Sequence, residues 1–184
     1  MLEMAGVPAV FLDRDGVINR DKGFIIDPDD LDLLPGAAES MKRLRTAGFK
    51  LIVVTNQSGI GQGLYTETDL AGVHDRLEAL LAAEGVHVEG IYFAPDHPER
   101  PTARRKPGPG MLLEAAEAHG IALRDSAMVG DQVRDAEAGM NAGCVLNILV
   151  PPGAGDPRFP AAPDLAGATA MILNILGTSA GKIV

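Results

Sequence analysis

The sequence predicts an α/β fold in which helices cover both faces of a doubly wound, mostly parallel sheet. Short apolar runs alternate along the chain with segments whose apolar residues recur at helical spacing, which is typical of such folds. Polar residues follow three of these runs: Asp13 and Asp15 after residues 9–12, Thr55 after residues 50–54, and Asp131 after residues 127–129. Because the carboxyl ends of parallel strands share one edge, where ligands bind, these residues predict a site.

Local signals predict the elements of the first half. Residues 9–12 are continuously apolar, which indicates a buried strand. Residues 19–34 combine a glycine, scattered apolar positions and the turn sequence Asp-Pro-Asp-Asp, so we expect a small flap or hairpin after the first strand. A Pro-Gly pair then begins a helix that Gly48 ends, and residues 50–54 form the second strand.

The second half repeats this alternation. Thr66 has the features of a helix N-cap, since an acidic first turn and an apolar stripe follow it. The other predicted elements are strands at residues 86–93, 127–129 and 145–150, helices at 109–119 and 131–142, and a closing helix at 165–176 after a Pro/Gly-rich connection.

The composition is that of one globular domain. The chain has 184 residues, of which 46% are hydrophobic; this is enough for one sizeable core and too little for two comfortable domains. We expect a single domain over residues 1–184, with a motif-bearing core at about 7–150 and a C-terminal connection and short helix at 151–184.

Neither a membrane span nor a signal peptide is visible in the sequence, and we expect a cytoplasmic monomer. Cys144 is the only cysteine, which excludes an internal disulfide and a metal cluster held by several thiolates.

The formal net charge of −9 argues against a nucleic-acid partner, because such binding requires clustered basic residues. The net charge does not exclude a small phosphorylated ligand, because the binding of such a ligand depends on the electrostatic potential at the site itself. Lys22, Arg104, Arg105 and Lys106 fall in loops that the sheet edge would gather. We therefore expect a positive pocket for a small phosphorylated metabolite, with no nucleic acid and no membrane as partner.

The residues after the strands could together hydrolyse a phosphate monoester. Asp13 could attack phosphorus, while Asp15, two residues on and pointing the same way, could protonate the leaving oxygen and later activate water. Asp13, Asp131 and a backbone carbonyl near Asp15 would form an oxygen site suited to Mg²⁺. The remaining roles have candidates too: Lys106 to balance the negative charge, and the Thr55 hydroxyl with the Asn56 amide to bind phosphoryl oxygens.

These residues resemble the four motifs of the haloacid dehalogenase superfamily of phosphatases: Asp-Arg-Asp-Gly-Val at residues 13–17, Thr55, Lys106, and Gly130-Asp131 with Asp135. Residues 13–19, 55–60 and 105–111 are further similar to the subfamily of heptose bisphosphate and histidinol-phosphate phosphatases. The resemblance covers about residues 7–150. It implies a Rossmann-like fold with no large cap domain and a Mg²⁺-dependent phosphatase that acts through an aspartyl phosphate.

The resemblance also implies a substrate and a set of site residues. Heptose 1,7-bisphosphate is the expected substrate, and histidinol phosphate or another small phosphometabolite is the alternative. The implied catalytic residues are Asp13, Asp15, Thr55 and Lys106, and the implied metal ligands are Asp13, Asp15 and Asp131. The positions that line the substrate site in such relatives correspond to Asp21, Lys22, Gly23, Phe24, Thr55, Asn56, Gln57, Ser58, Arg105 and Lys106.

One departure from the subfamily concerns zinc. Many members carry a structural zinc in the loop before the lysine, with ligands in the patterns Cys-x-His and Cys-x-Cys. The corresponding positions here are Ala94, Asp96, Thr102 and Arg104, which do not form a tetrahedral zinc site. We therefore expect Mg²⁺ but no structural zinc, with the loop held by its prolines and by ion pairs of Asp96 or Glu99 with Arg104.

A receiver domain of two-component signalling is the main non-enzyme alternative, because it also combines an aspartyl phosphate, Mg²⁺, Thr and Lys in a doubly wound sheet. Receivers carry an acidic pair after the first strand and the phosphorylated Asp after the third. Here residues 94–96 read Ala-Pro-Asp, which disfavours a receiver. A dehalogenase would not need Asp15, and a catalytically silent binding protein of the same fold stays open.

Three residues have open roles at this stage. Asp135 could orient Lys106 or a metal-bound water, or bind the metal itself. His97 could contact substrate or stabilise its loop. We expect His74, within a predicted helix, to be a surface or interface residue.

Overall fold

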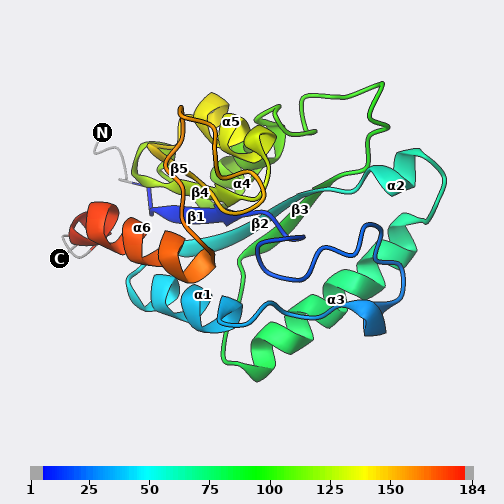
Figure 1. The fold of residues 1–184 in the computed structure, drawn as a ribbon, viewed down its shortest axis with the longest axis horizontal. Coiled ribbons are helices and arrows are strands. Elements are labelled where there is room, and N and C mark those ends of the chain that lie inside the picture. Colours follow the sequence, from blue (N-terminus) through cyan, green and yellow to red (C-terminus); the bar gives the residue numbers. More distant parts are fainter. Residues whose placement is uncertain (1–5, 181–184) are drawn as a thin grey trace.

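The sheet of the computed structural model, which describes residues 6–180, has five parallel strands in the order β3-β2-β1-β4-β5 (Figure 1). The strands are β1 (Ala9–Leu12), β2 (Lys50–Asn56), β3 (Gly90–Ala94), β4 (Ala127–Gly130) and β5 (Leu146–Leu149). From the central β1 the chain runs outward to β3, returns to β4 on the other side of β1, and ends at β5. The predicted doubly wound α/β fold is confirmed.

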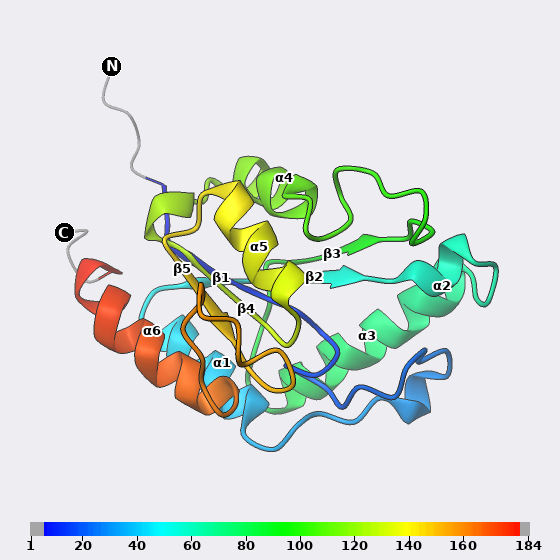
Figure 2. The same ribbon diagram turned by 45° about the horizontal axis from the view of Figure 1, so that its top comes forward.

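Helices cover both faces of the sheet. Figures 1 and 2 show α1 (Ala37–Thr46), α3 (Glu67–Ala83) and α6 (Leu165–Ala180) on one face, and α4 (Gly110–His119) and α5 (Val133–Ala142) on the other. The shorter helices are α2 (Ser58–Gly61) and the 3₁₀ turns η1 (Pro28–Asp30) and η2 (Leu123–Asp125). The sequence did not predict α2, because two of its four residues are glycines, which carry no helical signal.

The alternation of side chains along β1 divides the core into two layers. Val10 and Leu12 pack with residues of α1, α3 and α6, whereas Ala9 and Phe11 pack with residues of α4 and α5. All four side chains are fully buried, and burial of one the size of Leu12 contributes about 2 kcal/mol. A strand of only four residues is thus fixed from both faces, and it ends at the residue before Asp13.

Local signals explain where α3 and β3 begin. Thr66 Oγ1 accepts a hydrogen bond from Asp69 N (3.1 Å), and the Asp69 carboxylate accepts one from Thr66 N (2.8 Å), so α3 begins with the predicted cap. Strand β3 begins at Gly90 rather than at residue 86. The Glu89 carboxylate accepts a hydrogen bond from Leu51 N (2.7 Å), so a side chain takes the place that the backbone of a longer β3 would fill.

The predicted flap is a loop between β1 and α1. An antiparallel bridge between Asn19 and Leu33 closes its base, Ile25 and Leu31 are buried within it, and η1 packs beside α3 (Figure 2). No cap domain lies over the sheet edge in the part of the chain that the structure describes. The flap is therefore the segment that lies beside the carboxyl end of β1, where no cap domain is present among the described residues.

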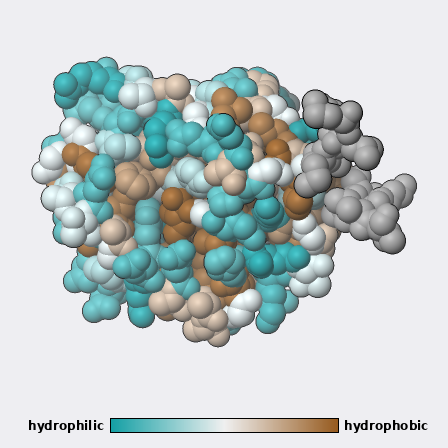
Figure 3. All heavy atoms as spheres, turned by 180° about the vertical axis from the view of Figure 1, so that it is seen from behind, coloured by the Kyte–Doolittle hydropathy of each residue, from teal (hydrophilic) through white to brown (hydrophobic). Residues whose placement is uncertain are grey.

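No helix between residues 6 and 180 combines the length and the apolar character that crossing a membrane requires. The face opposite to that of Figure 1 is mostly hydrophilic, and its hydrophobic atoms gather near the middle (Figure 3). The extent of the domain stays a prediction, and its ends at residues 1–5 and 181–184 lie outside the described residues.

Candidate active site

The residues that follow β1, β2 and β4 meet at the carboxyl edge of the sheet. Leu12 pairs with Val53 of β2 and with Val129 of β4, so the next residue, Asp13, lies between those two strands. A cavity of about 210 Å³ opens there. Ten of the predicted site residues line it: Asp13, Asp15, Asp21, Gly23, Phe24, Thr55, Asn56, Ser58, Lys106 and Asp131.

Lys106 is the centre of the charged cluster. Its buried Nζ lies 2.8 Å from Asp13 Oδ1 and 2.8 Å from Asp135 Oδ1, and it donates to Val54 O at 2.8 Å. Burial lowers the pKa of Lys106, but the two carboxylates outweigh burial and raise it, so the ammonium is charged. Of the open roles of Asp135, this ion pair supports the orientation of Lys106.

The side chain of Asn56 fixes the backbone of the same lysine. Its Oδ1 accepts from Lys106 N (3.0 Å), and its Nδ2 donates to Lys106 O (3.1 Å). Strand β2 thereby holds the residue that carries the ammonium, although the two residues are far apart in the sequence.

Three carboxylates of this cluster fit a divalent cation. Asp13, Asp131 and Asp135 each offer an oxygen, and these oxygens lie within 4.8 Å of one another. Burial raises the pKa of Asp13 to about 8, outweighing the attraction of Lys106, with Asp135 adding to the rise. Burial, and then the charge of Asp135, raise the pKa of Asp131 to about 6. The single ammonium of Lys106 therefore does not balance the three carboxyl groups of Asp13, Asp131 and Asp135. A divalent cation would supply the missing positive charge, and carboxylate oxygens are ligands that suit Mg²⁺.

Gly16 lets the first motif approach this cluster. Its φ of +80° is unfavourable for other residues, and a Cβ there would overlap the Asp131 carboxylate. The loop after β1 can therefore pass directly against Asp131 only because this position lacks a side chain.

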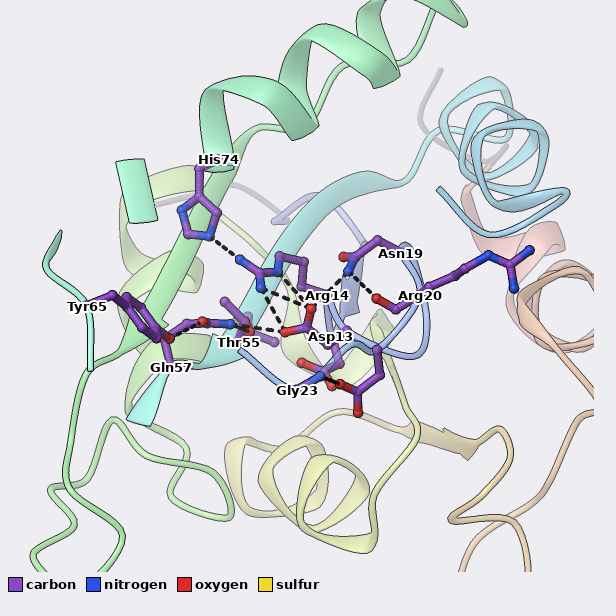
Figure 4. A network of polar contacts seen from close by, with 12 residues as sticks. Asp13, Arg14, Asn19, Arg20, Gly23, Thr55, Gln57, Tyr65 and His74 are labelled. Carbon is purple, nitrogen blue, oxygen red and sulfur yellow. Dashed lines mark hydrogen bonds and ion pairs between the residues drawn. The ribbon is translucent and has the colours of Figure 1, made fainter. Parts of the chain in front are cut away.

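The Asp15 carboxylate is held by Arg14, Asn19 and Gln57, which are labelled in Figure 4. It accepts hydrogen bonds from Arg14 Nη2 (3.0 Å to each oxygen), Asn19 Nδ2 (2.9 Å) and Gln57 Nε2 (3.1 Å). The Asp15 side chain does not belong to the cluster of Asp13, Asp131 and Asp135 whose oxygens could bind a metal ion. The sequence assigned no role to Arg14 or Asn19, although an arginine between two motif aspartates was a usable signal.

Three predicted substrate residues do not line the cavity. Lys22 Nζ binds Asp30 O (2.6 Å) and Asp32 (2.7 Å), and the buried Gln57 donates to Asp15 and Thr55. Arg105 lies near Arg134, whose charge, after burial, lowers the pKa of Arg105. The sequence did not single out Arg134, which lines the cavity with Gln132 and Asp135; its place beside Asp135 in the fourth motif was the available signal.

The loop before Lys106 is held by hydrogen bonds and one ion pair. Asp96 Oδ2 accepts from Thr102 N (2.5 Å), and Arg104 donates to Phe93 O (3.0 Å). The prediction that Arg104 pairs with Asp96 or Glu99 was wrong, because Arg104 lies 3.1 Å from Glu114 of α4 instead. His97 Nδ1 accepts from Glu99 N (3.2 Å), which supports a loop-stabilising role for His97.

Comparisons with known proteins agree with this site. A family model described as haloacid dehalogenase-like hydrolase matches residues 3–143. A Helicobacter pylori protein named D-glycero-beta-D-manno-heptose-1,7-bisphosphate 7-phosphatase is 43% identical over 143 residues, which are 77% of this chain and 82% of that protein. A Burkholderia mallei protein named for the alpha anomer is 41% identical over 149 residues, covering 77% and 79%.

A solved structure is also similar. It is D,D-heptose 1.7-bisphosphate phosphatase from B. bronchiseptica, complexed with magnesium and phosphate, with a TM-score of 0.81 and 33% identity over 91% of this chain and 98% of that one. The receiver-domain alternative is therefore excluded, since the matched sequences and the fold are those of hydrolases. The chain belongs to the haloacid dehalogenase-like hydrolases, and within that family it is a phosphatase.

Proposed function

We propose that the chain hydrolyses D-glycero-D-manno-heptose 1,7-bisphosphate at C7 through an aspartyl phosphate on Asp13. The observation that carries this proposal is the buried cluster of Asp13, Asp131 and Asp135 around Lys106 at the cavity, in a chain 43% and 41% identical to proteins named for this reaction. Those two relatives are named for opposite anomers, so the proposal includes both.

The first chemical step transfers the phosphoryl group to the enzyme. Lys106 holds Asp13 Oδ1 (2.8 Å), so the other carboxylate oxygen is free to bond to phosphorus. The bond between phosphorus and the C7 oxygen breaks, and Asp15 gives its proton to that oxygen. The Thr55 hydroxyl and the backbone amide of Asn56 bind the phosphoryl oxygens, whose charge Lys106 balances.

The second step releases phosphate. Asp15 removes a proton from water, the water oxygen attacks phosphorus, and the bond to Asp13 breaks. A bound Mg²⁺, held by Asp13, Asp131 and the backbone carbonyl of Asp15, would supply positive charge for the carboxylates and the phosphoryl group. Asp135 orients Lys106 through their ion pair.

The rest of the cavity would bind the sugar and its second phosphate. Asp21, Gly23, Phe24 and Ser58 line it, and are placed to contact the hydroxyl groups and the carbon chain of a heptose. We assign the C1 phosphate to Arg134, which lines the cavity, together with Arg105, which lies near it outside the cavity lining. An anion bound between the two guanidinium groups would offset their repulsion. Lys22 binds Asp30 and Asp32 and would hold the flap, whereas Gln57 binds Asp15 and Thr55 and would hold the loop after β1.

The test is the comparison of substrates with Mg²⁺ present. We expect a higher kcat/KM for heptose 1,7-bisphosphate than for histidinol phosphate, and heptose 1-phosphate as the product by ³¹P NMR. Arg105→Ala should raise KM more for the bisphosphate than for p-nitrophenyl phosphate, because the lost contact is to a non-reacting group. Arg100→Ala is the matched control, since Arg100 lines a different cavity.

A kcat/KM for histidinol phosphate that exceeds the bisphosphate value by about tenfold, or an equal effect of Arg105→Ala on both test substrates, would overturn the heptose assignment. The phosphatase activity itself would be unaffected by that result.

A further inference from the structure

Arg14 is a fully buried arginine directly behind Asp15. Its Nη2 and Nε face the Asp15 carboxylate, and its Nη1 lies 3.2 Å from Nε2 of His74 on α3. A guanidinium only donates hydrogen bonds, so His74 Nε2 must accept, and its proton is on Nδ1. Because a buried cation needs a partner for every donor group, His74 completes the set of contacts that holds Arg14 against Asp15 (Figure 4).

The position of His74 is well defined. The capping box of Thr66 fixes the start of α3 eight residues earlier, and the Phe93 ring of β3 lies 6.1 Å from the imidazole, centroid to centroid. Burial and the charge of Arg14 lower the pKa of His74 to about 4, which keeps the imidazole in its accepting form at neutral pH. His74 is only partly buried, which is compatible with the expected surface position, but the sequence did not predict its contact with Arg14.

A second pair of residues holds the other oxygen of Asp15. Gln57 Nε2 donates to Asp15 Oδ2 (3.1 Å) and to Thr55 Oγ1 (2.8 Å), while Gln57 Oε1 accepts from the Tyr65 hydroxyl (2.6 Å). The hydroxyl thereby sets which end of the amide faces Asp15. A Cβ at Gly59 of α2 would overlap the Tyr65 ring, so the glycine at this position makes room for the contact of Tyr65 with Gln57.

We propose that His74, through Arg14, and Tyr65, through Gln57, are positioning residues that aim the Asp15 carboxylate at the leaving oxygen. This rests on the proposed function, in which Asp15 is the general acid. Loss of either support lets the carboxylate turn, which slows protonation of the leaving group and not the attack of Asp13 on phosphorus. The effect must therefore depend on the leaving group: a sugar alkoxide requires a proton, whereas p-nitrophenolate leaves without one.

The test compares kcat/KM for heptose 1,7-bisphosphate and for p-nitrophenyl phosphate. His74→Leu should lose about tenfold on the sugar phosphate and less than about threefold on the nitrophenyl ester. His74→Gln should restore most of the sugar-phosphate activity, because its Oε1 can accept from Arg14. The matched control is His119→Leu in α4, which removes a similar hydrogen bond, to Tyr92 (3.1 Å), far from Asp15 in the fold, and should leave both activities unchanged.

Tyr65→Phe removes one hydroxyl and keeps the shape of the core, so it gives a result even if His74→Leu does not fold; we expect the same selective loss. Equal losses on both substrates, or no loss, in His74→Leu and Tyr65→Phe would overturn the inference. Asp15→Asn separates a failure of the proposed acid role of Asp15 from a failure of the positioning roles of His74 and Tyr65. If it is selective and the supports are not, only this inference fails, whereas equal loss on both substrates would overturn the role of Asp15 and the inference together.

Discussion

Lys106 shows how one residue can organise a site from three parts of the chain. Its ammonium lies between Asp13, which follows β1, and Asp135 of α5, while Asn56 at the end of β2 binds its backbone. A buried charge is tolerated only with partners of this kind, and loss of one member of a buried pair costs about 3–5 kcal/mol. Lys106 therefore offsets part of the carboxylate charge that is buried in the site, and its removal would leave that charge without a partner.

His74 gives a pH-dependent stability that can be measured. Its pKa is about 4 in the fold against an ordinary value of 6.5, so the unfolded chain takes up a proton first as the pH falls. The free energy of unfolding should therefore drop between about pH 6.5 and pH 4, by roughly 2 kcal/mol between pH 7 and pH 5 from this group.

Urea unfolding of the wild type and of His74→Gln at both pH values checks this, because the glutamine does not titrate and all other groups are shared. The wild type should lose about 2 kcal/mol more than the variant on acidification. An equal loss in the two proteins would show that His74 is not held neutral by its surroundings.

The sequence predicted the residues that line the cavity better than the residues that hold them in place. Asp13, Thr55 and Asp131 could be identified because each follows an apolar run, and parallel strands bring such positions together. The contact of Arg14 with His74 joins residues 60 positions apart, and it depends on how α3 packs. No periodicity in the sequence contains that information, so this contact of His74 could not be predicted.

At the scale of elements, hydrogen bonds and an ion pair between its own residues and their neighbours hold the loop between β3 and α4. Asp96 accepts from Thr102 N, and Arg104 joins Phe93 O to Glu114. We expect purified protein to contain no stoichiometric zinc by elemental analysis. EDTA should abolish activity reversibly, by removing Mg²⁺, while the helix content by circular dichroism stays constant.

Unfolding on removal of bound zinc would contradict this account of the loop. Arg104→Met should also make the loop more accessible to limited proteolysis, because it removes both the bond to Phe93 O and the pair with Glu114. The exposed Arg124, which pairs only loosely with its neighbour at 3.8 Å, offers Arg124→Met as the matched control.

Element boundaries were predictable where capping residues mark them. The helix after Thr66 begins with its predicted cap, and Gly143 ends α5 in the left-handed conformation (φ +99°). The start of β3 was not predictable, because the Glu89 side chain replaces backbone pairing there. The flap was predicted as a flap, but its buried Ile25 and the bridge at its base depend on tertiary contacts.

At the scale of the whole molecule, we predict a monomer. The large exposed hydrophobic residues of the described chain are spread over the flap, the turn after α2, α4, α5, the residue before β5, and α6: Phe24, Ile26, Leu64, Leu113, Met140, Val145 and Ile175. Scattered apolar residues are normal on monomer surfaces. Size-exclusion chromatography with light scattering should report the mass of one chain at micromolar concentration, and a stable dimer mass would refute the prediction. The cytoplasmic location also stays a prediction.

The fold class was predictable because a parallel sheet requires strands and helices to alternate, and the alternation is visible in the apolar pattern. In doubly wound sheets, sites form where successive connections leave in opposite directions across the sheet. Here the chain runs from β1 to β2 on one side and later to β4 on the other, so the cavity lies at the end of β1. The proposed covalent step takes place on Asp13, directly after that central strand.

Rapid quenching of the wild type with heptose 1,7-bisphosphate labelled with ³²P at C7 tests this step most directly. We predict a burst of acid-stable label on the peptide that contains Asp13, and neither label nor turnover in folded Asp13→Asn. An unlabelled wild-type enzyme under conditions of rapid turnover, or Asp13→Asn with wild-type steady-state rates, would contradict the account.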